Sequence, residues 1–376
     1  MTTLSEKVSE KVSQSAFDGS RLRVILLLDI HEGAQQRFLE AYEHLRSGVA
    51  SVPGHISDQL CQSIENPSQW LITSEWESAP PFLAWVNSEA HVEMVQPLHS
   101  CVRDTRSLRF SILRETPGIG VHTPESPRSR LQSTPRIGDG VVRHALTFTV
   151  KPGSESKVAE ILSGYRSPAA RVDDTTSLRR TSLFLHGNRV VRAVEVQGDL
   201  IAALRHVAQQ PEVRAVEEAI NPYLEQDRDL ADPDSARVFF TRAALPAVHR
   251  VASGPAEPAD VERHALLYPV KPGCGMAVAR LLALQEEQGA NDPDNPVVGS
   301  TIFQRDDIVV RMVDLRGPVE RTPVPVVGVT GKRTAAVLSR LLDLPEGHTL
   351  TDHRGLLRFL AHADMSPLTD RRATDS

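Results

Sequence analysis

Hydrophobic and polar positions alternate along three stretches of this chain that stand in the same register. Residues 141–153 (VVRHALTFTVKPG) and 261–273 (VERHALLYPVKPG) match at Arg-His-Ala-Leu, at one aromatic position and at the closing Val-Lys-Pro-Gly, 120 residues apart. A shift back by the same distance reaches residues 22–33 (LRVILLLDIHEG), a weaker match that also ends on glycine. Alternation with a period of two predicts a strand in each case. A repeat of this regularity indicates three copies of one structural unit, here called copies one, two and three.

Each copy continues with the same order of elements. A helical pattern, with apolar residues near i, i+3 and i+4, follows each glycine. Two strand-like runs joined by turn-forming residues come next, followed by a second helix. Closing strands are predicted at 107–113, 236–242 and 365–371. The order β-α-β-β-α-β in about 100 residues predicts an α+β fold made of three ferredoxin-like repeats.

Such a repeat places both helices on one face of its sheet and leaves the other face to be covered. Two sheets packed face to face would form a dimeric α+β barrel-type pair with an enclosed pocket. Three copies leave one without a mate in the same chain, so we predict a homodimer.

Composition shifts divide the chain into domains and linkers. Two Pro/Gly/Ser-rich stretches separate the copies, and a polar segment precedes them. The predicted boundaries are a disordered tail over 1–20, a ferredoxin-like domain over 21–114, a linker over 115–140, a second domain over 141–252, a linker over 253–260 and a third domain over 261–376.

The bulk composition narrows the function classes. A net charge of −6 over 376 residues carries no basic footprint, so nucleic acid is not an expected partner. No apolar run approaches the roughly 20 residues of a membrane span, and the polar N-terminus lacks the apolar core of a signal peptide. Three widely spaced cysteines without a CxxC motif indicate neither a disulfide framework nor a zinc site. We expect a cytoplasmic protein, and the sequence carries no nicotinamide, flavin or metal signature.

Two family resemblances follow from particular motifs. The run VPGHISDQLCQSIENPSQWLITSEWES, followed by FLAWVNSEAHVEMVQPL, resembles the antibiotic biosynthesis monooxygenase family of small dimeric α+β barrels. Copies two and three, with their two RHAL…VKPG strands and the closing MSPLTDRR, are similar to the SchA/CurD-like family of aromatic polyketide and spore-pigment gene clusters in actinomycetes.

These resemblances imply work on an aromatic polyketide. The leading expectation is a cofactor-independent monooxygenase that oxidises a phenolic or anthrone-type intermediate to a quinone, with molecular oxygen as co-substrate. One alternative is an aromatic polyketide cyclase, and another is a non-catalytic protein that binds the polyketide or stabilises a complex. The expected partners are an aromatic polyketide, other polyketide synthase tailoring enzymes and a second copy of the chain.

In copy one, strand alternation places Ile72 and Trp76 on the same face. The resemblance implies that Trp76 lines a pocket, whereas an asparagine of the family falls on Ile72 and a helix tyrosine falls on Phe82. We assign substrate-binding roles to Trp76, Phe82 and His91, and to Phe148 in copy two. The alternative is that Trp76 belongs to the core and that His91 lies on the surface.

Arg192 and Arg311 occupy the position of that isoleucine in copies two and three. An arginine on an apolar strand face is either paired or meets an anion. Each is therefore either a clamp for an enolate or phenolate or the partner of a carboxylate on a neighbouring strand. Glu75, Glu195 and Asp314 share another matched position; they either pair with such arginines or face water, and we favour the second reading.

His144 and His264 share strand faces with Phe148 and Tyr268, respectively. A histidine beside a tyrosine is a candidate base with a proton relay, although a histidine at a strand start is often structural. Only copy three has a hydroxyl at the aromatic position. We therefore prefer His264, Tyr268 and Arg311 as catalytic residues, with His144 and Arg192 as their counterparts in copy two.

Overall fold

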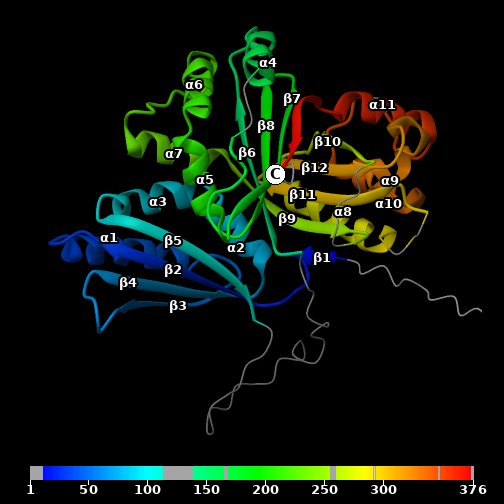
Figure 1. The fold of residues 1–376 in the computed structure, drawn as a ribbon. Helices are drawn as coiled ribbons and strands as arrows, with labels where there is room; N and C mark the ends of the chain where they lie inside the picture. The colour runs from blue at the N-terminus through cyan, green and yellow to red at the C-terminus, as the bar shows by residue number, and fades with distance from the viewer. Residues whose placement is uncertain are drawn as a thin grey trace, which may run out of the picture. The chain divides into compact units, whose positions relative to one another are not determined.

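The computed structural model describes residues 12–112, 139–164, 168–254, 260–290, 292, 294–345 and 348–373. The chain divides into two compact units (Figure 1): an N-terminal unit, Ala16–Arg136, and a C-terminal unit that combines Met1–Ser15 with Ile137–Ser376. Copy one forms the first unit, and copies two and three form the second. The predicted linker 115–140 falls almost wholly outside the described residues.

The N-terminal unit has the predicted β-α-β-β-α-β arrangement, with its second helix divided in two. Its four strands are antiparallel in the order β3-β4-β2-β5. The elements are β2 (Leu22–Ile30), α1 (Gln35–Val49), β3 (His55–Gln62), β4 (Gln69–Trp76), α2 (Ala79–Val86), α3 (Glu89–His99) and β5 (Val102–Ser111).

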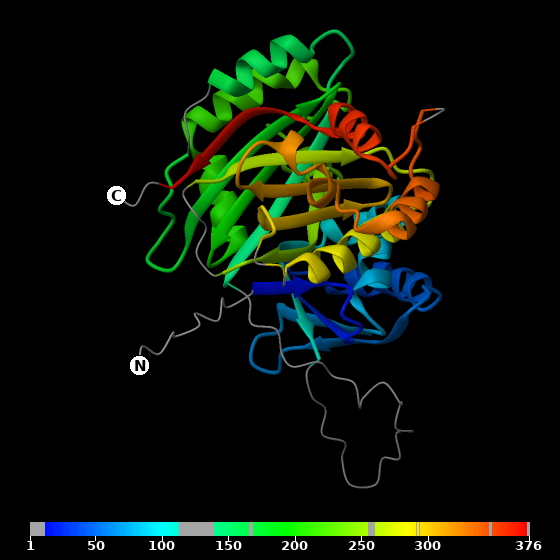
Figure 2. The same ribbon diagram turned by 90° about the vertical axis from the view of Figure 1, so that its right-hand side faces the viewer.

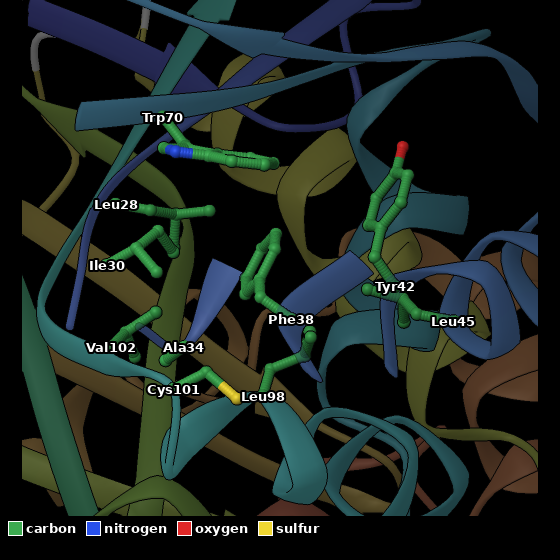
Figure 3. Packing of buried hydrophobic residues seen from close by; sticks show 10 residues of the cluster. All are labelled: Leu28, Ile30, Ala34, Phe38, Tyr42, Leu45, Trp70, Leu98, Cys101 and Val102. Carbon is green, nitrogen blue, oxygen red and sulfur yellow. The ribbon is translucent and has the colours of Figure 1, made fainter. Parts of the chain in front are cut away.

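The core of this unit lies between the helices and one face of the sheet. Leu28 from β2 and Trp70 from β4 pack against Phe38 of α1 and Leu98 of α3 (Figure 3). The Phe38 ring meets the Trp70 ring edge-on, with centroids 5.5 Å apart. The core residues of a strand recur at every second position, as Leu28 and Ile30 do in β2. Those of a helix lie on one side of it, as the apolar pattern requires.

The opposite face of this sheet carries apolar side chains without a covering helix in the same unit. Ile25 pairs with Leu108, and Leu27 pairs with Leu71, so these residues share that face. Leu27 is 42% exposed and Phe110 is 49% exposed.

The C-terminal unit contains two further β-α-β-β-α-β copies with additional helices. Copy two comprises β6 (Val141–Thr149), α4 (Glu155–Gly164), β7 (Ser177–His186), β8 (Arg189–Gln197), α5 (Leu200–Gln209), α6 (Pro211–Ile220), α7 (Pro233–Ala243) and β9 (Ala244–Ala252). Copy three comprises β10 (Glu262–Tyr268), α8 (Gly275–Gly289), β11 (Val297–Arg305), β12 (Ile308–Leu315), α9 (Pro323–Val327), α10 (Gly331–Leu341), α11 (His353–Ala363) and β13 (Ser366–Arg372).

Copies two and three pair with each other to form a nearly closed antiparallel barrel (Figure 2). The strand order is β10-β12-β11-β9-β6-β8-β7-β13. Strand β9 begins beside β6 of its own copy and then pairs with β11 of the other. Strand β13 pairs with β7 of copy two. Asp364, just before β13, forms a β-bridge with Leu266 of β10 in its own copy. Each closing strand thus joins its own sheet to that of its mate.

The barrel interior combines an apolar layer with a charged layer. Ala145, Phe184, Phe303 and Met312 contribute to the apolar layer. The charged layer is here called the interior ion network, and it contains four arginines and four carboxylates: Arg143, Arg180, Arg250, Arg263, Asp139, Glu195, Asp314 and Asp370.

Four ion pairs of this network link copy two to copy three, and two of them show the pattern. Arg263 of β10 lies 2.7 Å from Glu195 of β8, and Arg180 of β7 lies 3.0 Å from Asp314 of β12. Equal numbers of opposite charges meet the requirement that buried charges be paired. The network therefore favours this particular pairing of the two sheets.

Two predictions of local structure are wrong. Residues 12–15 of the predicted tail form strand β1 (Val12–Ser15), which pairs with β9. Residues 236–242, predicted as the closing strand of copy two, lie in helix α7, and the strand follows it as β9. The helix is favoured because Phe239 and Ala243, one turn apart, both pack into the core of copy two.

Candidate functional site

Arg192 and Arg311 each pair with a carboxylate, but on a helix rather than a neighbouring strand. The Nη1 atom of Arg192 lies 2.5 Å from Oε1 of Glu217 on α6. The Nε atom of Arg311 lies 2.6 Å from Oε1 of Glu286 on α8. Both arginines are therefore ion-paired in the structure. Direct binding of an enolate or phenolate by either arginine stays a prediction.

Glu217 balances two arginines in copy two. Its second oxygen accepts a hydrogen bond of 2.7 Å from Arg228, whose guanidinium also lies over the Phe239 ring, 4.5 Å from its centroid. Burial alone would raise the pKa of Glu217, but the two guanidinium groups outweigh it and hold the pKa below its ordinary value.

His264 and Tyr268 lie on the same face of β10 but have separate partners. Nδ1 of His264 is 3.6 Å from Oδ2 of Asp364, and that carboxylate raises the pKa of the imidazole. The Tyr268 hydroxyl donates to the carbonyl oxygen of Val327 at 2.8 Å, and burial raises its pKa to about 12 despite the opposing effect of Arg311. The structure therefore brings Tyr268 to Arg311 and gives His264 a different partner.

In copy two, Phe148 packs into the helix-covered core. Its ring centroid is 6.1 Å from that of Phe239 on α7. His144 is half-buried on the same strand face. Their predicted roles in substrate binding and catalysis stay predictions.

The three matched carboxylates do not face water, and that favoured reading is wrong. Glu75 is 8% exposed and pairs with Arg21 and with Arg23, the latter at 2.6 Å. Glu195 and Asp314 belong to the interior ion network. Burial would raise the pKa of Asp314, but the arginines around it hold that pKa well below its usual range.

The residues predicted in copy one do converge. Trp76 is fully buried, with its ring centroid 5.4 Å from that of Phe82 and 5.5 Å from that of Trp85. The ring of His91 meets Trp85 edge-on at 4.2 Å, and His55 meets Trp76 edge-on at 5.1 Å. These five residues are here called the tryptophan site. Sequence reasoning missed Trp85 and His55, although Trp85 lies one turn from Phe82 on the same helix.

His91 is half-buried, with its ring against Trp85, so the alternative of a surface histidine is wrong. Its Nδ1 atom is buried and has no hydrogen-bond partner among the described residues. Burial lowers its pKa to about 4, with a smaller contribution from His99. The side chain is therefore neutral at pH 7. Helix α3 positions it through its N-cap, because the Ser88 hydroxyl accepts a hydrogen bond from the backbone N–H of His91.

His55 connects the tryptophan site to a buried carboxylate. Its Nε2 atom lies 3.6 Å from Oδ1 of Asp58, and the other carboxylate oxygen accepts a hydrogen bond of 2.5 Å from the hydroxyl of Tyr42. Burial and this hydrogen bond raise the pKa of Tyr42 well above its ordinary value. The result is an ordered Tyr-Asp-His series that ends at the aromatic rings.

The two departures from the family pattern remain apolar in the structure. Ile72 packs against the core of copy one, and Phe82 is 3% exposed beneath the guanidinium of Arg109, 5.3 Å away. The polar groups of the site therefore come from the two histidines and the Trp76 indole. That indole N–H donates to the Ser74 hydroxyl at 3.0 Å.

The part of the chain that the structure describes was searched for metal-ligand clusters and for membrane-spanning helices. No group of three or more His, Cys, Asp or Glu side chains there could hold a metal ion, and no helix there is both long and apolar enough to cross a bilayer.

The fold defines a protein built from ferredoxin-like α+β repeats, of which the first is of the antibiotic biosynthesis monooxygenase type. Residues 21–97 match the family model of antibiotic biosynthesis monooxygenases, and residues 141–253 match the SchA/CurD-like domain. The chain belongs to the SchA/CurD family: it is 64% identical to "Polyketide synthase CurD" of Streptomyces cyaneus over 97% of this chain and 98% of that protein. It is also 60% identical to "Protein SchA" of Streptomyces halstedii, over 98% of each chain.

Similar solved structures cover about a quarter of the chain. One is SnoaB, a cofactor-independent oxygenase from Streptomyces nogalater, at 13% identity and a TM-score of 0.25, covering 26% of this chain and 99% of that one. Another is a conserved protein from Methanosarcina mazei Go1, at 19% identity and a TM-score of 0.24, covering 25% of this chain and 94% of that one.

Proposed function

We propose that the chain is a cofactor-independent monooxygenase that oxidises a phenolic or anthrone-type aromatic polyketide intermediate to a quinone at the tryptophan site. The observation that carries the proposal is that the family match over residues 21–97 spans a cluster of aromatic rings with two imidazoles, each of which has one buried ring nitrogen. The names of the curated relatives support a substrate from polyketide biosynthesis.

In this proposal a polycyclic phenol packs against these rings, of which Trp76 and Phe82 are buried in the structure. Trp76 and Trp85 are close to parallel, with an interplanar angle of 29°, and Phe82 meets Trp76 at 65°. Flat apolar surfaces with few polar groups are typical of sites for aromatic ligands. Exclusion of water by such rings strengthens the electrostatic interactions of a bound phenolate.

His55 is the proposed base. It takes the proton of the anthrone or phenol, and Asp58 supplies a counter-charge 3.6 Å away, itself fixed by Tyr42. The resulting carbanion reduces O₂ and forms a C–O bond. Loss of water from the peroxide leaves a C=O group, so that anthrone plus O₂ gives quinone plus H₂O. His91, neutral at pH 7, orients a substrate hydroxyl through its Nδ1 atom.

Oxygen uptake by flavin-free, chelator-treated protein with 1,8-dihydroxy-9-anthrone tests this proposal. We expect uptake above the protein-free rate, with H55Q lowering kcat by about 10²–10⁴ and H91Q mainly raising KM. His44, exposed on α1, provides the matched control H44Q. Altered ring closure of a polyketide without oxygen uptake would overturn the proposal in favour of a cyclase. No change in either product would indicate a binding protein.

A further inference from the structure

A cavity of about 590 Å³ lies in copy three, outside the tryptophan site. Residues of helix α8 and of strands β11 and β12 line it. A further wall, here called the roof, is formed by residues of the segment 325–330. Gly328 is required in this roof: its φ is +73°, and a Cβ atom there would lie 2.8 Å from Leu282. The volume falls within the range of about 300–1,000 Å³ that is usual for small-molecule sites.

Glu286 lines this cavity with an incompletely satisfied carboxylate. Its side chain is 2% exposed. Oε1 accepts hydrogen bonds from Arg311 and from the Ser300 hydroxyl. Oε2 is buried and has no hydrogen bond among the described residues; Nε2 of His249 lies 3.3 Å away without hydrogen-bond geometry. Buried carboxylate oxygens normally have a donor, and this one has only the His249 imidazole close by.

The charge of the cavity is balanced, which argues against an ionic ligand. Arg311 neutralises Glu286 and also donates to the backbone carbonyls of Pro325 and Val326. A cation or an anion would upset this balance, whereas a neutral hydroxyl group satisfies Oε2 without changing it.

The remaining walls combine apolar side chains with polar ones, such as Asn295. Val251, Val297, Val298 and Val329 line the cavity together with Pro325. Branched aliphatic side chains of this kind fit the face of a ring system rather than a polar chain.

We propose that this cavity is a second ligand site, which takes a neutral hydroxylated aromatic compound whose hydroxyl donates to Oε2 of Glu286. The choice of an aromatic ligand rests on the proposed function, but the site is separate from the tryptophan site. Most of the residues that line the cavity lie beyond both family matches reported above, which end at residues 97 and 253.

Calorimetric titration with emodin, a trihydroxylated anthraquinone, tests the proposal on the full chain. We expect two binding sites in the wild type and one in E286Q, with affinity at the cavity reduced at least about tenfold, the usual effect of losing a hydrogen bond to a charged group. A290F, which places a ring in the cavity and keeps the carboxylate, should also leave one site. E217Q breaks the matched ion pair in copy two and should keep both.

Tryptophan fluorescence separates the two sites, because all three tryptophans lie in the N-terminal unit. Quenching by emodin should persist in E286Q and A290F. A single site in the wild type, or unchanged binding in both cavity variants, would overturn the inference. Absent oxygen uptake with two emodin sites retained would refute the proposed function and leave the second site in place.

Discussion

The buried state of His91 makes the stability of the N-terminal unit depend on pH in a calculable way. The imidazole pKa falls from 6.5 to about 4 on folding, because burial disfavours the charged form. Between these two values the unfolded chain binds a proton that the folded unit does not. Stability is therefore lost as the pH falls through this window, and no more is lost below about pH 4. Proton linkage predicts that the free energy of unfolding falls by about 2 kcal/mol between pH 7 and pH 5.

Urea titrations at pH 7 and pH 5, followed by tryptophan fluorescence, measure this loss. The signal is local, because Trp85 meets His91 at 4.2 Å and all three tryptophans lie in this unit. H91Q should remove most of the difference between the two pH values, whereas the surface control H44Q should keep it. An equal pH dependence in wild type and H91Q would refute the argument that His91 is held neutral by burial.

Three further predictions concern the barrel, the aromatic core and the uncovered sheet face. D314N leaves buried guanidinium groups without a counter-charge and should lower the free energy of unfolding by about 3–5 kcal/mol, measured by urea unfolding followed by circular dichroism. D370N, whose carboxylate is 28% exposed, should lower it by less. Equal losses in the two variants would contradict the network. Because the pKa of Asp314 is depressed, its stabilisation should be lost as pH falls below the ordinary aspartate value near 3.8. W76A should destabilise the N-terminal unit by about 3–5 kcal/mol and W76F by less, since the indole is fully buried. If a second copy of the chain covers the face that carries Leu27 and Phe110, light scattering should give a dimer for the wild type and a monomer for L27K or F110K; a monomeric wild type would refute the homodimer.

The repeat in the sequence was sufficient to predict the fold, because strand alternation and glycine spacing are local properties. Residues 22–33 and their two matches all became the first strand of a ferredoxin-like unit. The error at 236–242 arose where a run of bulky side chains was read as a strand, although Phe239 and Ala243 lie one helical turn apart. Local propensity could not decide between the two, since packing on the core of copy two favours the helix.

The site was predictable only in part, because partners on other elements leave no local signal. Alternation placed Trp76 on the same strand face as Ile72, and the family resemblance implied that Trp76 lines a pocket. Its neighbour His55 comes from another strand, and the carboxylates of Glu217 and Glu286 come from helices that the strand pattern does not reach. An arginine on an apolar strand face indicates that it has a charged partner. The strand pattern does not indicate on which element that partner lies.

The central claim is that the tryptophan site inserts one oxygen atom from O₂ into an aromatic substrate without a bound cofactor. Mass spectrometry of the quinone formed from 1,8-dihydroxy-9-anthrone under ¹⁸O₂ tests it most directly, with flavin-free, chelator-treated protein and a protein-free control. The account predicts one ¹⁸O atom per quinone, formed faster than in the control, and a rate close to that control for H55Q. A product formed no faster than in the control, or at the same rate by H55Q and wild type, would contradict it.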